Sequence, residues 1–118
     1  MGSQDSGNYL RTHRKRSGLS QHEVAGVLGI ENGGVVCRYE LGRHLPPLLV
    51  ALALEAIFRV PISQLFRGLG EAVEQNIENR LLSLETELHS RSGKGPQAVI
   101  TAKKLRWLTE RRKVQPVA

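Results

Sequence analysis

One cysteine and four histidines are the side chains of this sequence that could serve as sulfur or nitrogen ligands of a metal ion. Their spacing is not that of a metal-ligand set, either among the histidines or with the cysteine. Only a neighbouring arginine would favour a reactive thiolate, so a redox sensor is not favoured. The sequence also lacks paired carboxylates, a nucleophile–base pattern and a glycine-rich phosphate loop. We therefore predict no metal, no cofactor and no catalysis from these residues: His13, His22, Cys37, His44 and His89.

A second group of side chains is basic. The chain carries 17 Lys and Arg against 11 Asp and Glu, a net charge of +6 with a pI near 10.1. Such a balance favours an anionic partner, most commonly nucleic acid, although a solvated basic surface gives the same totals. Near the N-terminus, Lys15 and Arg16 are possible phosphate contacts or simply part of a solvated helix face. Charge alone leaves both interpretations open.

Two short helices around a glycine-bearing turn would position these groups. Ser20 can cap the first helix, and Glu23 lies three residues later, the spacing of a capping box. Gly29 can end this helix in the left-handed conformation. Asn32 is a plausible cap for the second helix, with Val35, Val36 and Tyr39 as its apolar positions. Together they form a helix-turn-helix unit.

The remaining helices complete a compact all-α domain over residues 8–69, with residues 1–7 expected to be disordered. A basic helix over residues 8–17 should end at Gly18. Residues 48–58 are apolar almost all round, which predicts a central, buried helix. A last short helix over residues 63–66 should stop near Gly68 and Gly70.

Composition changes after Gly70, so residues 70–118 are expected to form a separate helical segment for dimerisation or interaction. Residues 71–90 hold five glutamates against one arginine and predict a long amphipathic helix. Its stripe could form a dimer seam, pack on the first domain or dock a partner protein; we favour the dimer. The stripe consists of Val73, Ile77, Leu81, Leu84 and Leu88.

A breaker cluster at residues 91–96 separates this helix from a basic last segment. Thr101 is a reasonable cap for the final helix, and Val99 and Ile100 either extend that helix or precede it. The basic segment could fold back on the acidic helix, or it could reach across DNA as a second electrostatic arm. Both alternatives remain open from the sequence.

Residues 8–67 resemble the Cro/CI-type (XRE) helix-turn-helix regulators. The resemblance rests on motifs that agree in order and at nearly the family spacing: Tyr9, Arg11, Arg14, Gly18-Leu19-Ser20-Gln21, Val24-Ala25, Leu28-Gly29, Arg38-Tyr39-Glu40, Gly42-Arg43, Pro46, Leu52-Ala53, Phe58-Arg59-Val60-Pro61 and Leu65-Phe66. It implies a five-helix DNA-binding domain that works as a homodimer on a pseudo-palindromic operator in double-stranded DNA.

The resemblance also implies roles for particular residues. Gln21, at the start of the second helix, would contact the DNA backbone or a base edge, and the third helix would enter the major groove. Arg14 and Glu40 match an internal ion pair of the family and are expected to be structural.

This sequence departs from the family at the turn, which is one residue longer between Gly29 and Tyr39. Base readout would then rest on side chains further along the third helix, and the two glycines would offer bare backbone to a phosphate. The DNA-binding set is Ser20, Gln21, Asn32, Gly33, Gly34, Cys37, Arg38 and Arg43, with possible phosphate contacts from Lys15, Arg16, His22 and His44.

We therefore expect a DNA-binding transcriptional regulator that acts as a repressor. We expect it to be cytoplasmic, since neither a signal peptide nor an apolar stretch long enough to span a membrane is visible. The alternative is an antitoxin-like or adaptor protein. In that case residues 71–118 would bind a partner protein, and DNA binding would serve autoregulation.

Overall fold

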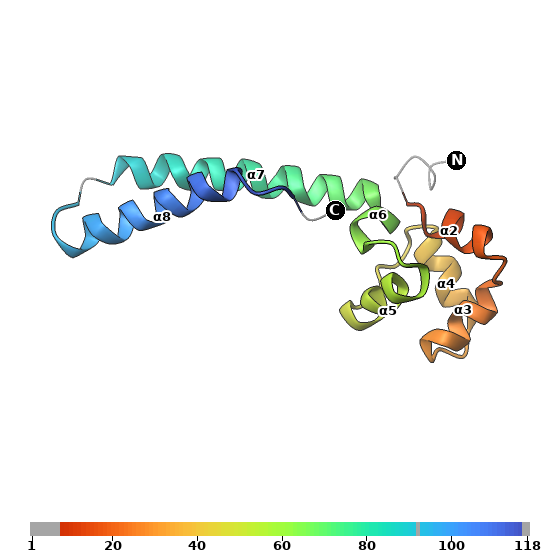
Figure 1. The fold of residues 1–118 in the computed structure, drawn as a ribbon. Helices are drawn as coiled ribbons and strands as arrows, with labels where there is room; N and C mark the ends of the chain where they lie inside the picture. Colours follow the sequence, from red (N-terminus) through yellow and green to blue (C-terminus); the bar gives the residue numbers. More distant parts are fainter. Residues whose placement is uncertain (1–7, 92, 117–118) are drawn as a thin grey trace. The chain divides into compact units, whose positions relative to one another are not determined.

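The computed structural model describes residues 8–91 and 93–116. The named secondary-structure elements in these residues are all helices, which confirms the all-α prediction (Figure 1). The predicted disordered leader, residues 1–7, lies outside the described residues. The chain divides into two compact units, one through Ala72 and one from Val73. The helices are α2 (Leu10–Ser17), α3 (Gln21–Leu28), α4 (Gly33–Glu40), α5 (Leu48–Phe58), α6 (Ile62–Leu65), α7 (Arg67–Ser90) and α8 (Pro96–Arg112).

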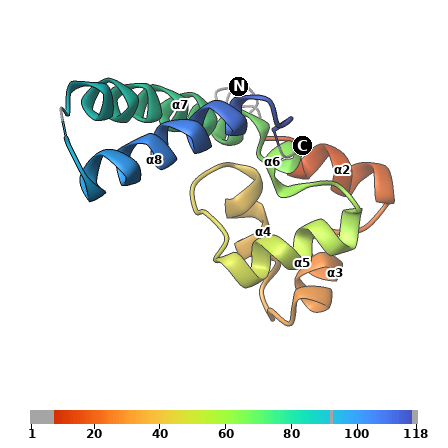
Figure 2. The same cartoon turned by 60° about the vertical axis from the view of Figure 1, so that its left-hand side comes forward.

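The first unit folds around an aliphatic core with two aromatic members. Each of α2 to α6 contributes at least one buried side chain, and Figure 2 shows these helices gathered around a common centre. Burial of this apolar surface is the main favourable term that holds the helices together. The buried members are Leu10, Val24, Ala25, Val36, Tyr39, Leu54, Leu65 and Phe66.

The predicted ends of α3 and α4 are confirmed. The Ser20 hydroxyl accepts a hydrogen bond from the Glu23 amide at 3.0 Å, and the Ser20 amide donates to the Glu23 carboxylate at 2.9 Å. Gly29 ends α3 with a φ of 79°, a left-handed value that favours glycine. The Asn32 side chain caps α4 by accepting from the Gly34 amide at 2.8 Å. Local sequence thus sets these boundaries.

The first helix begins later than predicted, at Leu10. Asn8 instead pairs with Phe66 in an antiparallel bridge and uses both ends of its side chain. Its carbonyl accepts from the Leu10 amide at 3.0 Å, and its amide donates to the Tyr39 carbonyl at 2.7 Å. These contacts with distant parts of the chain replace the first helical turn.

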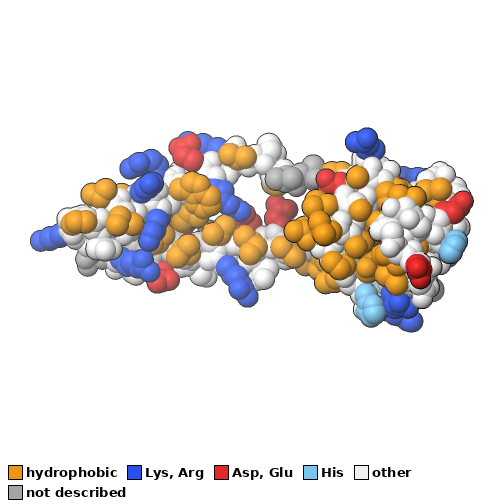
Figure 3. All heavy atoms as spheres, turned by 90° about the horizontal axis from the view of Figure 1, so that it is seen from below, with side chains coloured by type: hydrophobic (Ala, Val, Ile, Leu, Met, Phe, Trp, Pro, Cys, Tyr) orange, Lys and Arg blue, Asp and Glu red, His pale blue; other side chains and the backbone are white. Residues whose placement is uncertain are grey.

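The predicted helix over residues 48–58 is confirmed as α5, but the prediction that this helix is buried is wrong. Within α5 only Leu54 is buried, whereas Leu48 is 74% and Leu49 80% exposed. A domain of this size has too few elements to cover every side of a helix. Apolar side chains accordingly occupy a broad part of the surface of the first unit in Figure 3.

The predicted stop near Gly68 and Gly70 is also wrong, because α7 begins at Arg67 and continues through both glycines. The break falls instead at Phe66, whose φ of −119° and ψ of 56° separate α6 from α7. A Cβ at position 70 would lie 3.0 Å from the Ser63 carbonyl oxygen. Gly70 therefore permits a close approach of backbone rather than a helix end.

The second unit is an antiparallel helical hairpin made by α7 and α8 (Figure 1). Leu88 and Leu108 are buried in it, and Leu81 and Leu105 are half-buried. The predicted cap at Thr101 is wrong. The helix α8 begins at Pro96, since proline at the first helical position sacrifices no helical hydrogen bond, and it includes Val99 and Ile100.

The predicted apolar stripe of α7 lies on one side of the helix, and the hairpin covers it only in part. Leu88 is buried and Leu81 is half-buried, whereas Val73, Ile77 and Leu84 are 53%, 44% and 40% exposed. Residues four and three apart drift around a helix of 3.6 residues per turn, so one partner helix cannot cover them all.

Two ion pairs join the helices of the hairpin. Arg111 pairs with Glu78, and the Arg112 guanidinium donates to the Glu85 carboxylate at 2.5 Å. The C-terminal end of α8 thus folds back on the acidic helix. The hydrogen bonds from these arginines lower the pKa of both carboxyl groups.

Acidification should loosen the hairpin. A carboxyl group with a lowered pKa stabilises the folded state at neutral pH, and this contribution is lost as the pH falls from the ordinary value of 4.5 through the lowered one. Far-ultraviolet circular dichroism from about pH 7 to about pH 3 should show helix loss. A full-length Glu78→Gln/Glu85→Gln variant should lose less helix over this range. Equal losses in both proteins would contradict the role of these pairs.

Candidate nucleic-acid interface

The first turns of α3 and α4 meet backbone to backbone at Gly33. A Cβ at this position would lie 3.1 Å from the backbone nitrogen and 3.2 Å from the Cα of His22, and 3.3 Å from the carbonyl carbon of Gln21. None of these three atoms belongs to a flexible side chain that could move aside. Close packing of the two helices therefore favours glycine here, because a larger residue would force the backbones a few tenths of an ångström apart. Sequence reasoning missed this role when it treated both glycines as backbone for a phosphate.

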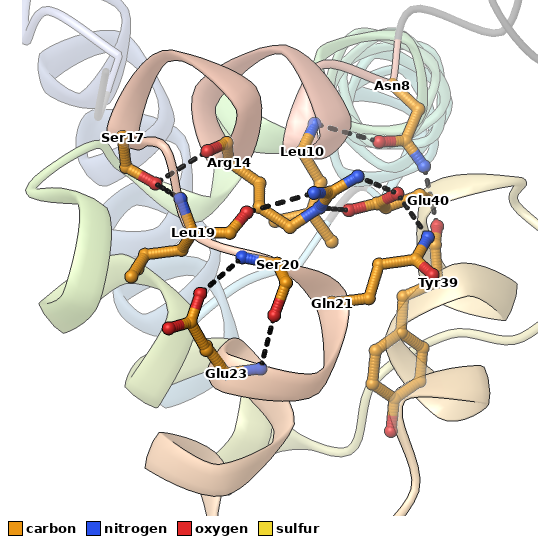
Figure 4. A network of polar contacts seen from close by, with 10 residues as sticks. All are labelled: Asn8, Leu10, Arg14, Ser17, Leu19, Ser20, Gln21, Glu23, Tyr39 and Glu40. Carbon is orange, nitrogen blue, oxygen red and sulfur yellow. Dashed lines mark hydrogen bonds and ion pairs between the residues drawn. The ribbon is translucent and has the colours of Figure 1, made fainter.

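A buried polar network holds α2, α3 and α4 in one arrangement (Figure 4). The Arg14 Nε donates to Glu40 Oε2 at 2.5 Å, and the Gln21 amide donates to Glu40 Oε1 at 3.0 Å. A further Arg14 nitrogen donates to the Leu19 carbonyl at 3.0 Å. The Arg14 and Glu40 side chains are 10% and 2% exposed, so this pair is shielded from water.

Two residues that sequence reasoning assigned to DNA use polar atoms within the domain instead. The Gln21 amide is bonded to Glu40, and the Ser20 hydroxyl caps α3. These hydrogen bonds to Ser20 also lower the pKa of the Glu23 carboxyl. Ser20 and Gln21 thus help to fix the start of α3 against α4.

The side of α4 that faces away from the core carries little bulk. Val36, Tyr39 and Glu40 are buried, whereas Gly34 and Cys37 lie on the partly exposed side. A helix with such small side chains can approach a groove closely. The remaining partly exposed side chain with a charge on α4 is Arg38.

Arg38 folds back along α4 toward its first turn, the direction that long side chains take in helices. One of its terminal nitrogens lies 3.6 Å from the position that a Cβ on Gly34 would occupy. Its Nε is buried with no hydrogen-bond partner among the described residues. The guanidinium therefore adds to the positive end of the helix dipole and creates a favourable place for an acceptor or an anion.

Asn32 is partly committed by its cap. The carbonyl oxygen of its side chain already accepts from the Gly34 amide, and the residue is exposed. A bidentate contact with adenine uses both the oxygen and the amide group of an asparagine. Such a contact would compete with the cap, so the amide group is the part of Asn32 that can contact a base without loss.

The loop after α4 folds back against the last turn of that helix. The backbone amides of Arg43 and His44 donate to the Arg38 carbonyl at 2.9 Å and 3.4 Å. Both side chains are exposed. The other predicted phosphate contacts are exposed too, and the full set is Lys15 and Arg16 on α2, His22 on α3, and Arg43 and His44 in this loop.

Residues 6–65, half of the chain, match the family model of the helix-turn-helix domain. The chain belongs to this family, and the match identifies a DNA-binding regulator of the helix-turn-helix class. No curated protein and no solved structure matches the chain. No helix among the described residues is long and apolar enough to span a membrane.

Proposed function

We propose that the protein is a Cro/CI-type repressor that binds a pseudo-palindromic operator as a homodimer, with α4 in the major groove. The observation that carries this proposal is the side of α4 that faces away from the core. That side combines small residues with a single arginine folded over the positive end of the helix. It suits close entry into a groove more than binding of a large apolar ligand.

Arg38 is the proposed base-reading residue. An arginine can donate two hydrogen bonds to the O6 and N7 atoms of guanine, and a good bidentate pair is worth about 1–3 kcal/mol of discrimination. Its side chain donates no hydrogen bond among the described residues, so DNA would gain this donor without breaking an internal bond. Cys37 and the amide group of Asn32 would line the same groove.

Backbone affinity would come from the exposed groups around α4. Neutralisation of phosphates by Lys and Arg releases counterions, so binding should weaken steeply as salt rises. Such contacts set register and orientation but carry no sequence information. The proposed phosphate contacts are Lys15, Arg16, His22, Arg43 and His44.

Dimerisation through α7 is part of this proposal, with Val73, Ile77 and Leu84 as the residues that face the partner. Leu81 and Leu88, which the sequence also assigned to the dimer, are half-buried and buried within the hairpin. The exposed fractions of Val73, Ile77 and Leu84 support it, because these apolar side chains lack cover in a single chain. A symmetric dimer would match the two-fold symmetry of an operator.

The test is selection of bound sequences from a random DNA library by the purified full-length protein. We expect a pseudo-palindrome whose half-sites lie about 10–10.5 base pairs apart, or a multiple of that spacing. Arg38→Ala should relax the preference at one position of each half-site, whereas Lys15→Ala should weaken binding to all sequences alike. Recovery of no common sequence, together with a bound protein partner, would favour the antitoxin-like alternative.

A further inference from the structure

The hairpin of α7 and α8 has an apolar side that its own two helices do not cover. On α7 this side consists of Val73, Ile77 and Leu84, which are 40–53% exposed. On α8 it consists of Ile100 and Trp107, at 44% and 60%, and Val114, 70% exposed, follows two residues after the end of that helix. We call these six residues the outer apolar face.

The helical residues of this face lie along one line on each helix because of their spacing. Ile77 and Leu84 are seven residues apart on α7, as are Ile100 and Trp107 on α8. Seven residues are close to two helical turns, so each pair drifts by only about 20°. Leu81, which is half-buried, and Leu108, which is buried, lie at other positions around their helices.

Both lines fall on the same side of the hairpin. At about 100° per residue, Ile77 and Leu84 lie about 40–60° around α7 from Leu81, and Ile100 and Trp107 lie about 80–100° around α8 from Leu108. Because the helices are antiparallel, these rotations carry both lines to one side. By the same reasoning Leu82 falls on the opposite side of α7, and Val99 lies about 180° from Leu108, outside this face.

The hairpin by itself is a poor candidate for independent stability. Only Leu88 and Leu108 are buried in it. The chain has a single cysteine, and the described residues hold no cluster of metal ligands, so neither a disulfide within the hairpin nor a metal site supplements its core. Units of this size usually need association to be stable.

We propose that the outer apolar face binds the same face of a second copy, so that two hairpins form an antiparallel four-helix bundle. In this arrangement α7 of one copy packs against α8 of the other. The inference deepens the proposed function, on whose homodimer it rests, by placing the dimer contact on both helices and by including Trp107.

Charge selects this pairing of helices. The helix α7 carries five glutamates and two arginines, a net charge of −3, and α8 carries five Lys and Arg and one glutamate, a net charge of +4. Contact between α7 and the partner's α8 brings opposite charges together, whereas contact between two copies of α7 brings like charges together. Lys103 and Lys104, on either side of the outer apolar face, take part in none of the ion pairs formed among the described residues.

The size of the face fits a dimer. Six such side chains at about half exposure present on the order of 500 Å² of apolar surface, against about 800 Å² in total for one side of a standard interface. In the two-fold symmetric bundle both copies of α7 begin at the same end. Each contact between the apolar residues of α7 and those of the partner's α8 therefore occurs twice.

Trp107 is the only tryptophan of the chain, so it reports on its own burial. Full-length protein should sediment as a dimer, with blue-shifted tryptophan emission that is protected from acrylamide. Dilution through the dissociation range should shift the emission to the red as monomer forms. A monomer at all concentrations would overturn the proposal, as would a dimer in which acrylamide quenches Trp107 as strongly as in free tryptophan.

A matched pair of variants locates the contact. Ile100→Glu alters the outer apolar face, and Val99→Glu alters the adjacent, more exposed residue outside this face. We expect Ile100→Glu to raise the dissociation constant of the dimer about ten-fold or more, and Val99→Glu to leave it almost unchanged. Equal effects would overturn the proposed face.

The same proteins separate this inference from the proposed function. Binding to a DNA duplex with a single half-site, at low salt, depends on the first unit alone and should survive Ile100→Glu. If wild-type protein forms the dimer described but selects no DNA sequence, the proposed function fails and the bundle stands. If operator binding is intact while both variants dimerise normally, the bundle fails and the function stands.

Discussion

Replacement of Glu40 by leucine should destabilise the first unit by about 3–5 kcal/mol, because it leaves the Arg14 charge buried without a partner. Small domains are stable by only about 5–15 kcal/mol, so this loss removes a large fraction of the free energy of unfolding. Thermal and urea unfolding, followed by circular dichroism, would measure the loss.

The double variant Arg14→Met/Glu40→Leu is the matched control. Removal of both charges eliminates the unpaired ion, so the double variant should recover a large part of the lost stability. The Gln21 and Leu19 groups that bond to this pair would still lose their partners, which limits the recovery. If the double variant is no more stable than Glu40→Leu, the cost does not come from a buried unpaired arginine.

Gly34→Glu should abolish operator binding without unfolding the protein. A Cβ at position 34 meets side-chain atoms and no backbone, namely the capping oxygen of Asn32 at 3.0 Å and a terminal nitrogen of Arg38 at 3.6 Å. A glutamate there is favourable for the helix dipole and can pair with Arg38 four residues later. Repulsion of phosphates and loss of the Arg38 contact should weaken DNA binding about 100-fold or more, as measured by fluorescence anisotropy with the selected operator.

Alanine at each of the two glycines provides the controls. Gly34→Ala should leave both folding and DNA binding close to wild type. Gly33→Ala should lower stability by about 1–3 kcal/mol, because its Cβ meets the backbone of α3 rather than a side chain that can move. Operator binding by Gly34→Glu at wild-type strength would show that the first turn of α4 does not face DNA.

Local sequence patterns predicted some helix ends of this chain correctly and others not. The ends of α3 and α4 could be predicted from Ser20, Gly29 and Asn32, because capping depends on residues within a turn of one another. The helix-turn-helix class likewise follows from the order and spacing of motifs, and the family match supports it. The stop at Gly68 and Gly70 failed because a glycine also serves close packing, which no local pattern reveals.

The candidate interface was predictable only in part. Arg38 is a charged, partly exposed residue of α4, as its sequence position suggested, but its fold over Gly34 and its buried Nε depend on the packed helix. Gln21 has the residue type of a DNA contact, whereas its amide bonds to Glu40 across 19 positions of sequence. A side chain's partner at that separation is set by how the helices pack.

By itself the sequence determined most of the helices, the caps of α3 and α4 and the class of the protein, because these depend on neighbouring residues and on motif spacing. The tertiary structure decided which apolar side chains are covered and which glycine allows close packing. It buried Leu54 but left Leu48 and Leu49 exposed, and it divided the stripe of α7 between α8 and the outer apolar face. The physical reason is that hydrophobicity shows that a side chain gains from burial, whereas only the packed helices determine which surface is available to bury it.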